Sequence, residues 1–189
     1  MNKEVIILIS AWITTTLMLL LFVPKNKLRE AIAIFFFKQF LTWVTGLAVV
    51  EFGLIEYPVR MFANATKSSF DFEYYFYPAI CVVFNLHYPK GKSKLSEYLH
   101  YFYFCSIMTV LEVFIERYTD ILEYIHWTWY ITWITLFITF YLSHKFYLWY
   151  FEIKHLKPWI SMLRCFLFFQ QSPFEPFRYI TKPFLSQPL

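Results

Sequence analysis

Residues Leu111–Tyr130 have the sequence LEVFIERYTDILEYIHWTWY, in which four acids, an arginine and a histidine stand between two long apolar, aromatic runs. The acids are spaced by four, four and three residues, which would align them on one face of a continuous helix; they are Glu112, Glu116, Asp120 and Glu123. Each flanking run, however, is long enough to cross a bilayer. We therefore expect a turn here that emerges at one membrane surface and carries acid into the end of the preceding span.

The composition of the chain is that of a membrane protein. Of its 189 residues, 59% are hydrophobic and 24% aromatic, and only 16% are charged, whereas a soluble domain carries about a quarter charged residues. The net charge of +4 is spread along the chain without a basic block or an acidic tail, which argues against a nucleic-acid partner. We expect one all-α polytopic domain in contact with the lipid bilayer.

Five apolar segments are predicted to span the membrane. They cover residues of about 5–23, 31–55, 72–88, 98–115 and 124–147. The first lacks the basic amino end and the cleavage pattern of a signal peptide, so we interpret it as a retained span.

The third segment is the weakest of the five. Pro78 lies near its start, and Asn85 and His87 are polar residues near its end. Its aromatic ends are typical of the membrane interface, which favours a short span. A re-entrant segment is the alternative.

The carboxyl-terminal region, residues 152–189, differs from the rest. Its one apolar run, Trp159–Phe169, is too short to span and contains Arg164, so it is predicted to be amphipathic and to lie on the membrane. The prolines that follow prevent a regular helix. We expect a cytoplasmic amphipathic segment followed by an extended, Pro- and Phe-rich end.

The basic residues predict the orientation of the bundle. With five crossings, the connections at residues 24–30 and 89–97 fall on the same side as the carboxyl-terminal region, and together they hold most of the lysines and arginines. By the positive-inside rule that side is cytoplasmic, which puts the amino end outside and the carboxyl end inside. Most of the acids fall on the other side, so we expect an acidic outer mouth.

Two acids inside predicted spans, Glu51 and Glu112, are the main candidates for a polar site. An acid costs roughly 2.5–3.5 kcal/mol at the centre of a membrane helix, so it usually faces the bundle interior or a partner. The candidate polar or cation site consists of Glu51, Glu112, Glu116, Arg60, Arg117 and His126.

Two interpretations of this site stay open. In one, Glu112 pairs with Arg60 or Lys67 and holds the bundle together, while Glu116 and the acids after it are wetted surface charges. In the other, the acids form a cation or proton site.

Catalytic and metal chemistry find little support in the residue spacing. Two ExxH pairs, Glu97 with His100 and Glu123 with His126, are typical of di-metal carboxylate bundles, but they are predicted at opposite membrane surfaces. Glu112, Glu116 and Arg117 resemble an intramembrane peptidase only loosely, because the doubled glutamate of EExxxR is absent.

The three cysteines, Cys81, Cys105 and Cys165, stand in apolar or aromatic contexts without zinc-type spacing, and we expect buried free thiols. No cofactor motif is present, and the balance of these patterns is against an enzyme.

Three stretches resemble a known group of proteins. They are LTWVTGLAVVEFGLIEYPVRMF (Leu41–Phe62), EYYFYPAICVVFNLHYP (Glu73–Pro89) and YIHWTWYITW (Tyr124–Trp133). Across Lys38–Phe151 the chain resembles a family of small, uncharacterised multi-pass membrane proteins of endospore-forming, Bacillus- and Clostridium-type bacteria. This resemblance implies about five spans in a bacterial plasma membrane. It gives no indication of what the activity is.

Two functions follow as hypotheses. The first is a non-enzymatic accessory or structural subunit that acts through a membrane-protein partner or as a homo-oligomer, because five short spans leave no soluble catalytic or sensory domain. The second is a small transporter, channel or sensor that uses the acidic mouth. A transport path would need polar residues in the inner half of the bundle, where Lys38, Asn85, His87 and His100 are the candidates.

Overall fold

A computed structural model describes residues 3–155, with side chains as far as Phe151. The chain divides into two units, residues 1–151 and 152–189. The predicted amphipathic run and the Pro- and Phe-rich end lie outside the described residues, as does Cys165.

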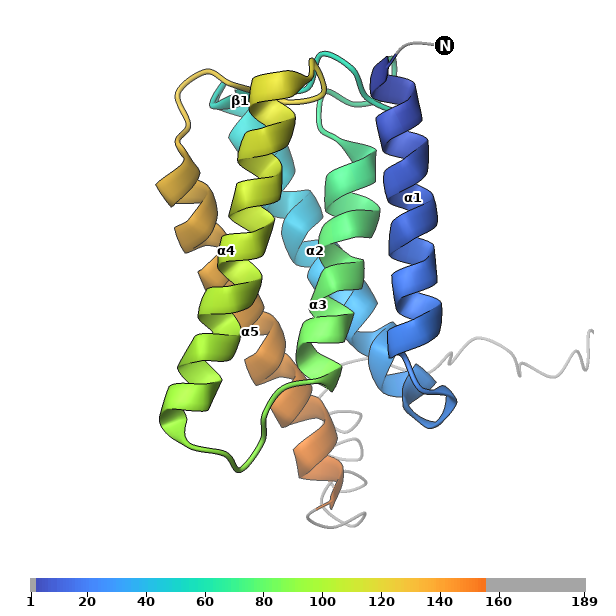
Figure 1. The fold of residues 1–189 in the computed structure, drawn as a ribbon, viewed down its shortest axis with the longest axis vertical. Helices are drawn as coiled ribbons and strands as arrows, with labels where there is room; N and C mark the ends of the chain where they lie inside the picture. Colours follow the sequence, from blue (N-terminus) through green and yellow to red (C-terminus); the bar gives the residue numbers. More distant parts are fainter. Residues whose placement is uncertain (1–2, 156–189) are drawn as a thin grey trace, which may run out of the picture. The chain divides into compact units, whose positions relative to one another are not determined.

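The first unit is an antiparallel helical bundle (Figure 1). A 3₁₀ turn η1 (Lys25–Lys27) precedes the second helix and a π-helical segment η2 (Asp71–Phe76) precedes the third. The helices are α1 (Lys3–Phe22), α2 (Leu28–Glu51), α3 (Tyr77–Leu86), α4 (Lys94–Tyr118) and α5 (Trp129–His155). Consecutive helices run in opposite directions, as short connections between packed helices require.

Among the described residues, three helical stretches are long and apolar enough to cross a membrane: α1, α2 together with η1, and α4. The third helix, α3, has 10 residues and continues η2 without a break. In Figure 1 it lies between α1 and α4, and its side chains are the most deeply buried of the bundle: Ala79, Cys81 and Phe84 have no exposed surface. The segment that looked weakest as a span is therefore the central one. A helix shielded by its neighbours needs neither the length nor the uniform apolarity of a lipid-facing helix.

The Leu111–Tyr130 stretch is part helix and part turn. α4 continues to Tyr118, so Glu112 and Glu116 lie on the same helix, and the connection begins at Thr119, whose backbone is extended. Residues Glu123–Tyr124 form strand β2, which delays the start of α5 to Trp129. The predicted turn is thus present but begins later, and only the last two acids of the series lie in it.

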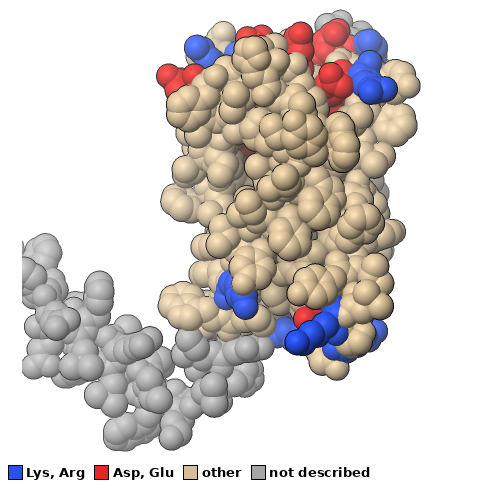
Figure 2. All heavy atoms as spheres, turned by 90° about the vertical axis from the view of Figure 1, so that its left-hand side faces the viewer, with Lys and Arg blue, Asp and Glu red and all other residues tan. Residues whose placement is uncertain are grey.

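Strand β2 joins the two connections at one end of the bundle. It pairs antiparallel with β1 (Ile55–Glu56), with Ile55 opposite Tyr124 and Glu56 opposite Glu123. We call this end, made by residues 52–70 and 119–128, the acidic end, and the other, made by the turns at residues 23–27 and 87–93, the basic end. Figure 2 shows acidic side chains, together with some lysines and arginines, at the acidic end, and mostly lysines and arginines at the basic end. A broad, nearly uncharged band lies between the two ends.

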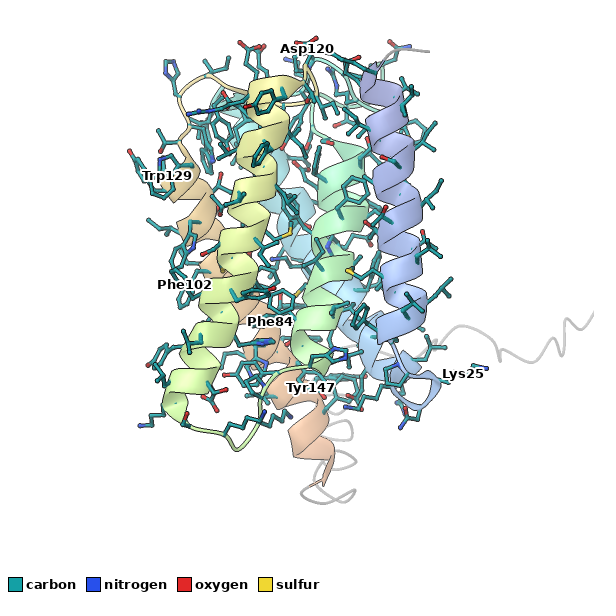
Figure 3. The ribbon with its side chains drawn as sticks, in the orientation of Figure 1. Lys25, Phe84, Phe102, Asp120, Trp129 and Tyr147 are labelled. Atoms are coloured by element: carbon teal, nitrogen blue, oxygen red, sulfur yellow. The ribbon has the colours of Figure 1, made fainter. Side chains whose placement is uncertain are left out.

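Aromatic side chains form the core of the bundle. Phe84 of α3 packs with ring-centroid distances of 4.9 Å to Tyr101, 5.4 Å to Phe104 and 4.8 Å to Phe140, and it lies between the helices in Figure 3. Such ring pairs add about 0.5–1.5 kcal/mol each beyond the burial of their area. They connect α3 to α4 and α5 through large side chains.

Candidate functional site

The carboxyl group of Glu112 is the centre of a buried hydrogen-bond cluster. Its side chain is 6% exposed and accepts hydrogen bonds from the hydroxyls of Tyr77 (2.5 Å), Tyr124 (2.7 Å) and Thr132 (2.8 Å). These donors come from α3, β2 and α5, so one acid on α4 ties three other elements together. The three hydroxyl donors occupy three of the roughly four acceptor sites of a carboxylate.

Trp127 fixes the orientation of this cluster. Its indole Nε1 donates to Thr132 Oγ1 at 2.7 Å, so the hydrogen of the threonine hydroxyl is free to point to Glu112. The partners of Glu112 are therefore hydroxyls, and over residues 3–151 neither Arg60 nor Lys67 lies at ion-pair distance from it. The expected structural pairing with a basic residue is replaced by neutral donors.

A second buried acid, Glu73, lies on η2. Its side chain is 3% exposed, and its Oε2 accepts a hydrogen bond from the buried hydroxyl of Ser68. The carboxyl group rests against Gly46 of α2, in the place that a Cβ atom would fill. Thr42 Oγ1 donates to the Glu73 carbonyl oxygen at 2.6 Å and holds the two backbones together. Glu73 therefore depends on a glycine on the facing helix.

The two acids line one cavity of about 200 Å³ in the half of the bundle near the acidic end. Apolar and aromatic side chains form much of its wall, together with a row of threonines. The lining residues are Thr42, Thr45, Gly46, Val49, Ile55, Tyr57, Glu73, Tyr77, Glu112, Trp127, Thr132, Thr135, Leu136, Ile138 and Thr139. None of these is Lys, Arg or His, so no side chain in the lining balances the charge of the two acids.

Tyr57 brings an unused hydroxyl to this cavity. It is 6% exposed and lines the cavity, yet its hydroxyl has no hydrogen-bond partner among the residues that the structure describes. Burial raises the pKa of the Tyr57 phenol well above its usual 10.0, and the nearby charges of Glu73 and Glu112 raise the pKa further. Tyr57 is therefore a neutral group at physiological pH, available to a ligand.

Arg60 fixes the loop that carries Tyr57. Its guanidinium donates to the carbonyl oxygens of Tyr57 (2.6 Å), Thr66 (2.8 Å) and Ala63 (3.2 Å). A planar group with five donors suits such a clip. Arg60 supports the site from behind and does not pair with an acid in it.

Lys38 is a buried cation just beyond the cavity. It has no exposed surface, donates from Nζ to Thr139 Oγ1 at 2.6 Å, and lies 4.5 Å from the centroid of the Phe140 ring. Within residues 3–151 no carboxylate reaches ion-pair distance of its ammonium group. Thr139 also lines the cavity. The hydroxyl that accepts the hydrogen bond from Lys38 therefore belongs to a residue of the cavity wall.

Buried polar groups continue from this point toward the basic end. Along α5, Ser143 follows Thr139 by one helical turn and donates to its carbonyl oxygen at 2.7 Å. Next, His144 Nδ1 lies 3.0 Å from Asn85 Oδ1, and Asn85 Nδ2 donates to the Cys81 carbonyl oxygen at 2.9 Å. We call Lys38, Thr139, Ser143, Asn85 and His144 the polar column. Of the inner-half candidates, Lys38 and Asn85 belong to it, whereas His87 is exposed and His100 contacts the Phe84 carbonyl oxygen.

Only one of the six predicted site residues lines the cavity. Glu112 does; Glu51, Arg117 and His126 are exposed, and Glu116 is partly exposed. Glu73, Tyr57 and Thr132 were not predicted as site residues. One signal was available for Glu73: Gly46 is an isolated glycine inside an apolar helical segment, which indicates a close approach of another group.

Several reactive groups outside the cavity have structural surroundings. Asp71 is buried and accepts a hydrogen bond from Trp12 Nε1 at 2.8 Å, which ties η2 to α1. Cys81 and Cys105 are buried free thiols, as expected. In the described part of the chain, no three His, Cys, Asp or Glu side chains are placed to hold a metal ion. No protein-family model, curated protein or solved structure matches the chain.

Proposed function

We propose that this protein is a small integral membrane transporter or sensor that binds a cation in the cavity between Glu73 and Glu112. One observation carries the proposal: two carboxyl groups, buried and drawn from different helices, face one cavity whose lining has no basic residue. Charged acids in so apolar a setting are costly unless protons or a bound cation compensate them.

The membrane arrangement is part of the same proposal. In this proposal the chain crosses the membrane five times. The amino end is outside, and the carboxyl end is in the cytoplasm of a bacterium of the endospore-forming type. The opposite charge of the two ends of the bundle supports the orientation. The central burial of η2 and α3, residues 71–86, supports a third crossing that is short and covered by protein.

The polar column favours transport over sensing alone. A conduction path requires polar groups beyond the binding site, and Lys38, Thr139, Ser143, Asn85 and His144 supply them from the floor of the cavity toward the basic end. Such groups inside a membrane bundle are typical of ion and proton pathways.

An accessory subunit is the second candidate. A groove between α4 and α5, about 530 Å³ in volume, is lined by aromatic residues and by Ser106 and Thr109. The Thr109 hydroxyl is buried and lacks a hydrogen-bond partner among the described residues. Small and hydroxyl-bearing residues are typical of contacts between membrane helices. Affinity purification from native membranes tests this candidate, and a monomer without a partner would contradict it.

The cation site can be tested in lipid nanodiscs. Binding of Na⁺, K⁺ and ammonium ions is measured by the change in Trp fluorescence. Trp127, in the cavity wall, contributes to this signal. Glu73→Gln and Glu112→Gln remove one acid each, while Glu51→Gln and Glu116→Gln are controls at an exposed and a partly exposed position next to the acidic end. We expect the first pair to weaken cation binding at least tenfold and the second pair to leave it unchanged. Equal effects of both pairs would reject the site.

A further inference from the structure

We propose that the cation is a lipophilic organic ammonium ion and that it enters the cavity sideways, from the bilayer, between α2 and α5. This inference rests on the cation-binding function proposed above and adds the chemical class of the ligand and its route.

The lining chemistry favours an organic cation over a metal ion. Hard metal ions such as Ca²⁺ take six to eight oxygen ligands, whereas much of this wall is carbon, with Val49, Ile55, Leu136 and Ile138 beside the acids. The rings of Tyr57, Tyr77 and Trp127 also line it. Aromatic faces beside carboxylates are the usual surroundings of bound ammonium groups.

Hydrogen-bond capacity is left over at the points where an ammonium group would need it. The Tyr57 hydroxyl is unpartnered, and of the two Glu73 oxygens only Oε2 accepts a hydrogen bond from the described residues. An oxygen from each residue can therefore accept an N–H donor, while Glu112 adds charge from α4. Tyr57 is buried and lines the cavity, so its free hydroxyl points to a ligand independently of the acids.

The size of the cavity agrees with a ligand that has an apolar body. At about 200 Å³, it is several times the roughly 30 Å³ share of a water molecule. A dehydrated metal ion would leave most of this space empty, whereas an ammonium group with a short aliphatic or aromatic substituent would fill it.

The opening of the cavity lies on the side of the bundle. Thr45 of α2 and Thr135 and Ile138 of α5 line it and are exposed. Thr45 stands within the apolar length of α2, so this opening is in the band that would face acyl chains. At the acidic end, Ile55 and Trp127 belong to the wall, and the β1–β2 ribbon connects the loops there. A lipophilic amine dissolved in the bilayer therefore reaches the opening directly.

Calorimetry in phosphatidylcholine nanodiscs tests the ligand class, with 4-phenylbutylammonium as the probe and methylammonium and K⁺ as comparisons. Empty nanodiscs correct for partitioning into lipid. We expect the probe to bind at least tenfold more tightly than either comparison and to lose at least tenfold in affinity in Glu73→Gln and in Glu112→Gln. Glu73→Gln alone decides the test if Glu112→Gln does not yield a monodisperse protein.

The route is tested by Thr135→Phe, which places a large side chain at the opening, with Thr135→Val as the control of similar size to threonine. We expect Thr135→Phe to slow association of the probe at least tenfold relative to Thr135→Val, as measured by stopped-flow Trp quenching. Unchanged association would overturn lateral entry. Acid-dependent binding of K⁺ or methylammonium without a preference for the probe would overturn the ligand class and leave the cation site intact. Loss of acid dependence for every cation would overturn both.

Discussion

The carboxyl group of Glu73 occupies the space beside Gly46 that a Cβ atom would fill. Gly46 lies inside α2, so the requirement for glycine comes from this close approach and not from the local backbone conformation. The same contact brings Thr42 of α2 within 2.6 Å of the Glu73 carbonyl oxygen. The absence of a side chain at Gly46 thus leaves the space in which the buried Glu73 carboxyl group lies.

Gly46→Ala is expected to displace the Glu73 carboxyl group and to lower both stability and cation affinity. Forcing one extra carbon into a packed site costs about 1–3 kcal/mol. In a Glu73→Ala background the same substitution should become neutral or stabilising, because alanine is favoured over glycine in a helix by about 1 kcal/mol. Unfolding in mixed micelles of the four proteins measures this coupling. Equal costs in both backgrounds would contradict the contact.

Tyr77→Phe is expected to destabilise the bundle by about 1–3 kcal/mol, since the buried carboxyl group of Glu112 loses one of its hydrogen-bond donors. The Tyr77 hydroxyl donates to the Glu112 carboxyl group at 2.5 Å, which is the shortest of the three hydrogen bonds that this carboxyl group accepts. In a Glu112→Gln background the cost should fall to that of a neutral hydrogen bond, about 0.5–1.5 kcal/mol. Tyr118→Phe, at an exposed position on α4, serves as the control and should change little.

The helical architecture followed from hydropathy, and the two ends followed from charge. Long apolar segments predicted the helices, and the sorting of lysines from acids predicted a basic and an acidic end. Glu112 could be singled out because an acid within an apolar segment requires a polar interior. These features are local in the sequence.

The partners of Glu112 could not be predicted in the same way. Tyr77, Tyr124 and Thr132 are ordinary residues in their own segments, and only the packing of α3, β2 and α5 around α4 brings their hydroxyls together. Glu73 was not predicted as a site residue because it stands at the start of the predicted third span, whereas η2 carries it into the interior of the bundle.

Lys38→Met is expected to leave the fold intact, with stability unchanged or raised by up to about 4 kcal/mol, as when other buried charges are replaced by apolar groups of similar volume. Lys38 has no carboxylate partner at ion-pair distance in the described bundle, so no opposite charge is stranded. Its positive charge near the cavity floor opposes a bound cation, and its loss should raise cation affinity at least about threefold.

The control for Lys38 is Thr139→Val, which keeps the charge and removes its hydrogen-bond acceptor. We expect this variant to lose about 1.5–3 kcal/mol of stability, the value for a hydrogen bond to a charged group. Thermal unfolding in detergent compares the two variants. A strongly destabilised Lys38→Met protein would show that the contacts of the ammonium group with Thr139 and the Phe140 ring outweigh the cost of burying its charge.

The stability of the bundle is expected to fall at high pH partly because of Tyr57. Its pKa is raised in the folded state above the usual 10.0, so below that pH the phenol is neutral in both states. As pH rises beyond 10.0, the unfolded chain releases the proton and the folded chain retains it, which lowers the free energy of unfolding. Tyr57→Phe should therefore show a shallower loss of stability between about pH 9 and about pH 11 in chemical unfolding. An identical slope in both proteins would contradict the burial of this hydroxyl.

Arg60→Ala is expected to weaken cation binding although Arg60 does not line the cavity. Its guanidinium holds the carbonyl oxygens of Tyr57, Ala63 and Thr66, so its removal frees the loop that positions the Tyr57 hydroxyl. We expect a loss of about 1–3 kcal/mol in stability from the carbonyls left unpaired and a several-fold loss of cation affinity. Arg117→Ala removes the same charge from an exposed position at the same end and should change neither quantity. If Arg117→Ala weakens binding as much as Arg60→Ala does, the loop clip is not the cause of the loss, because the removal of a positive charge at this end by itself favours a bound cation.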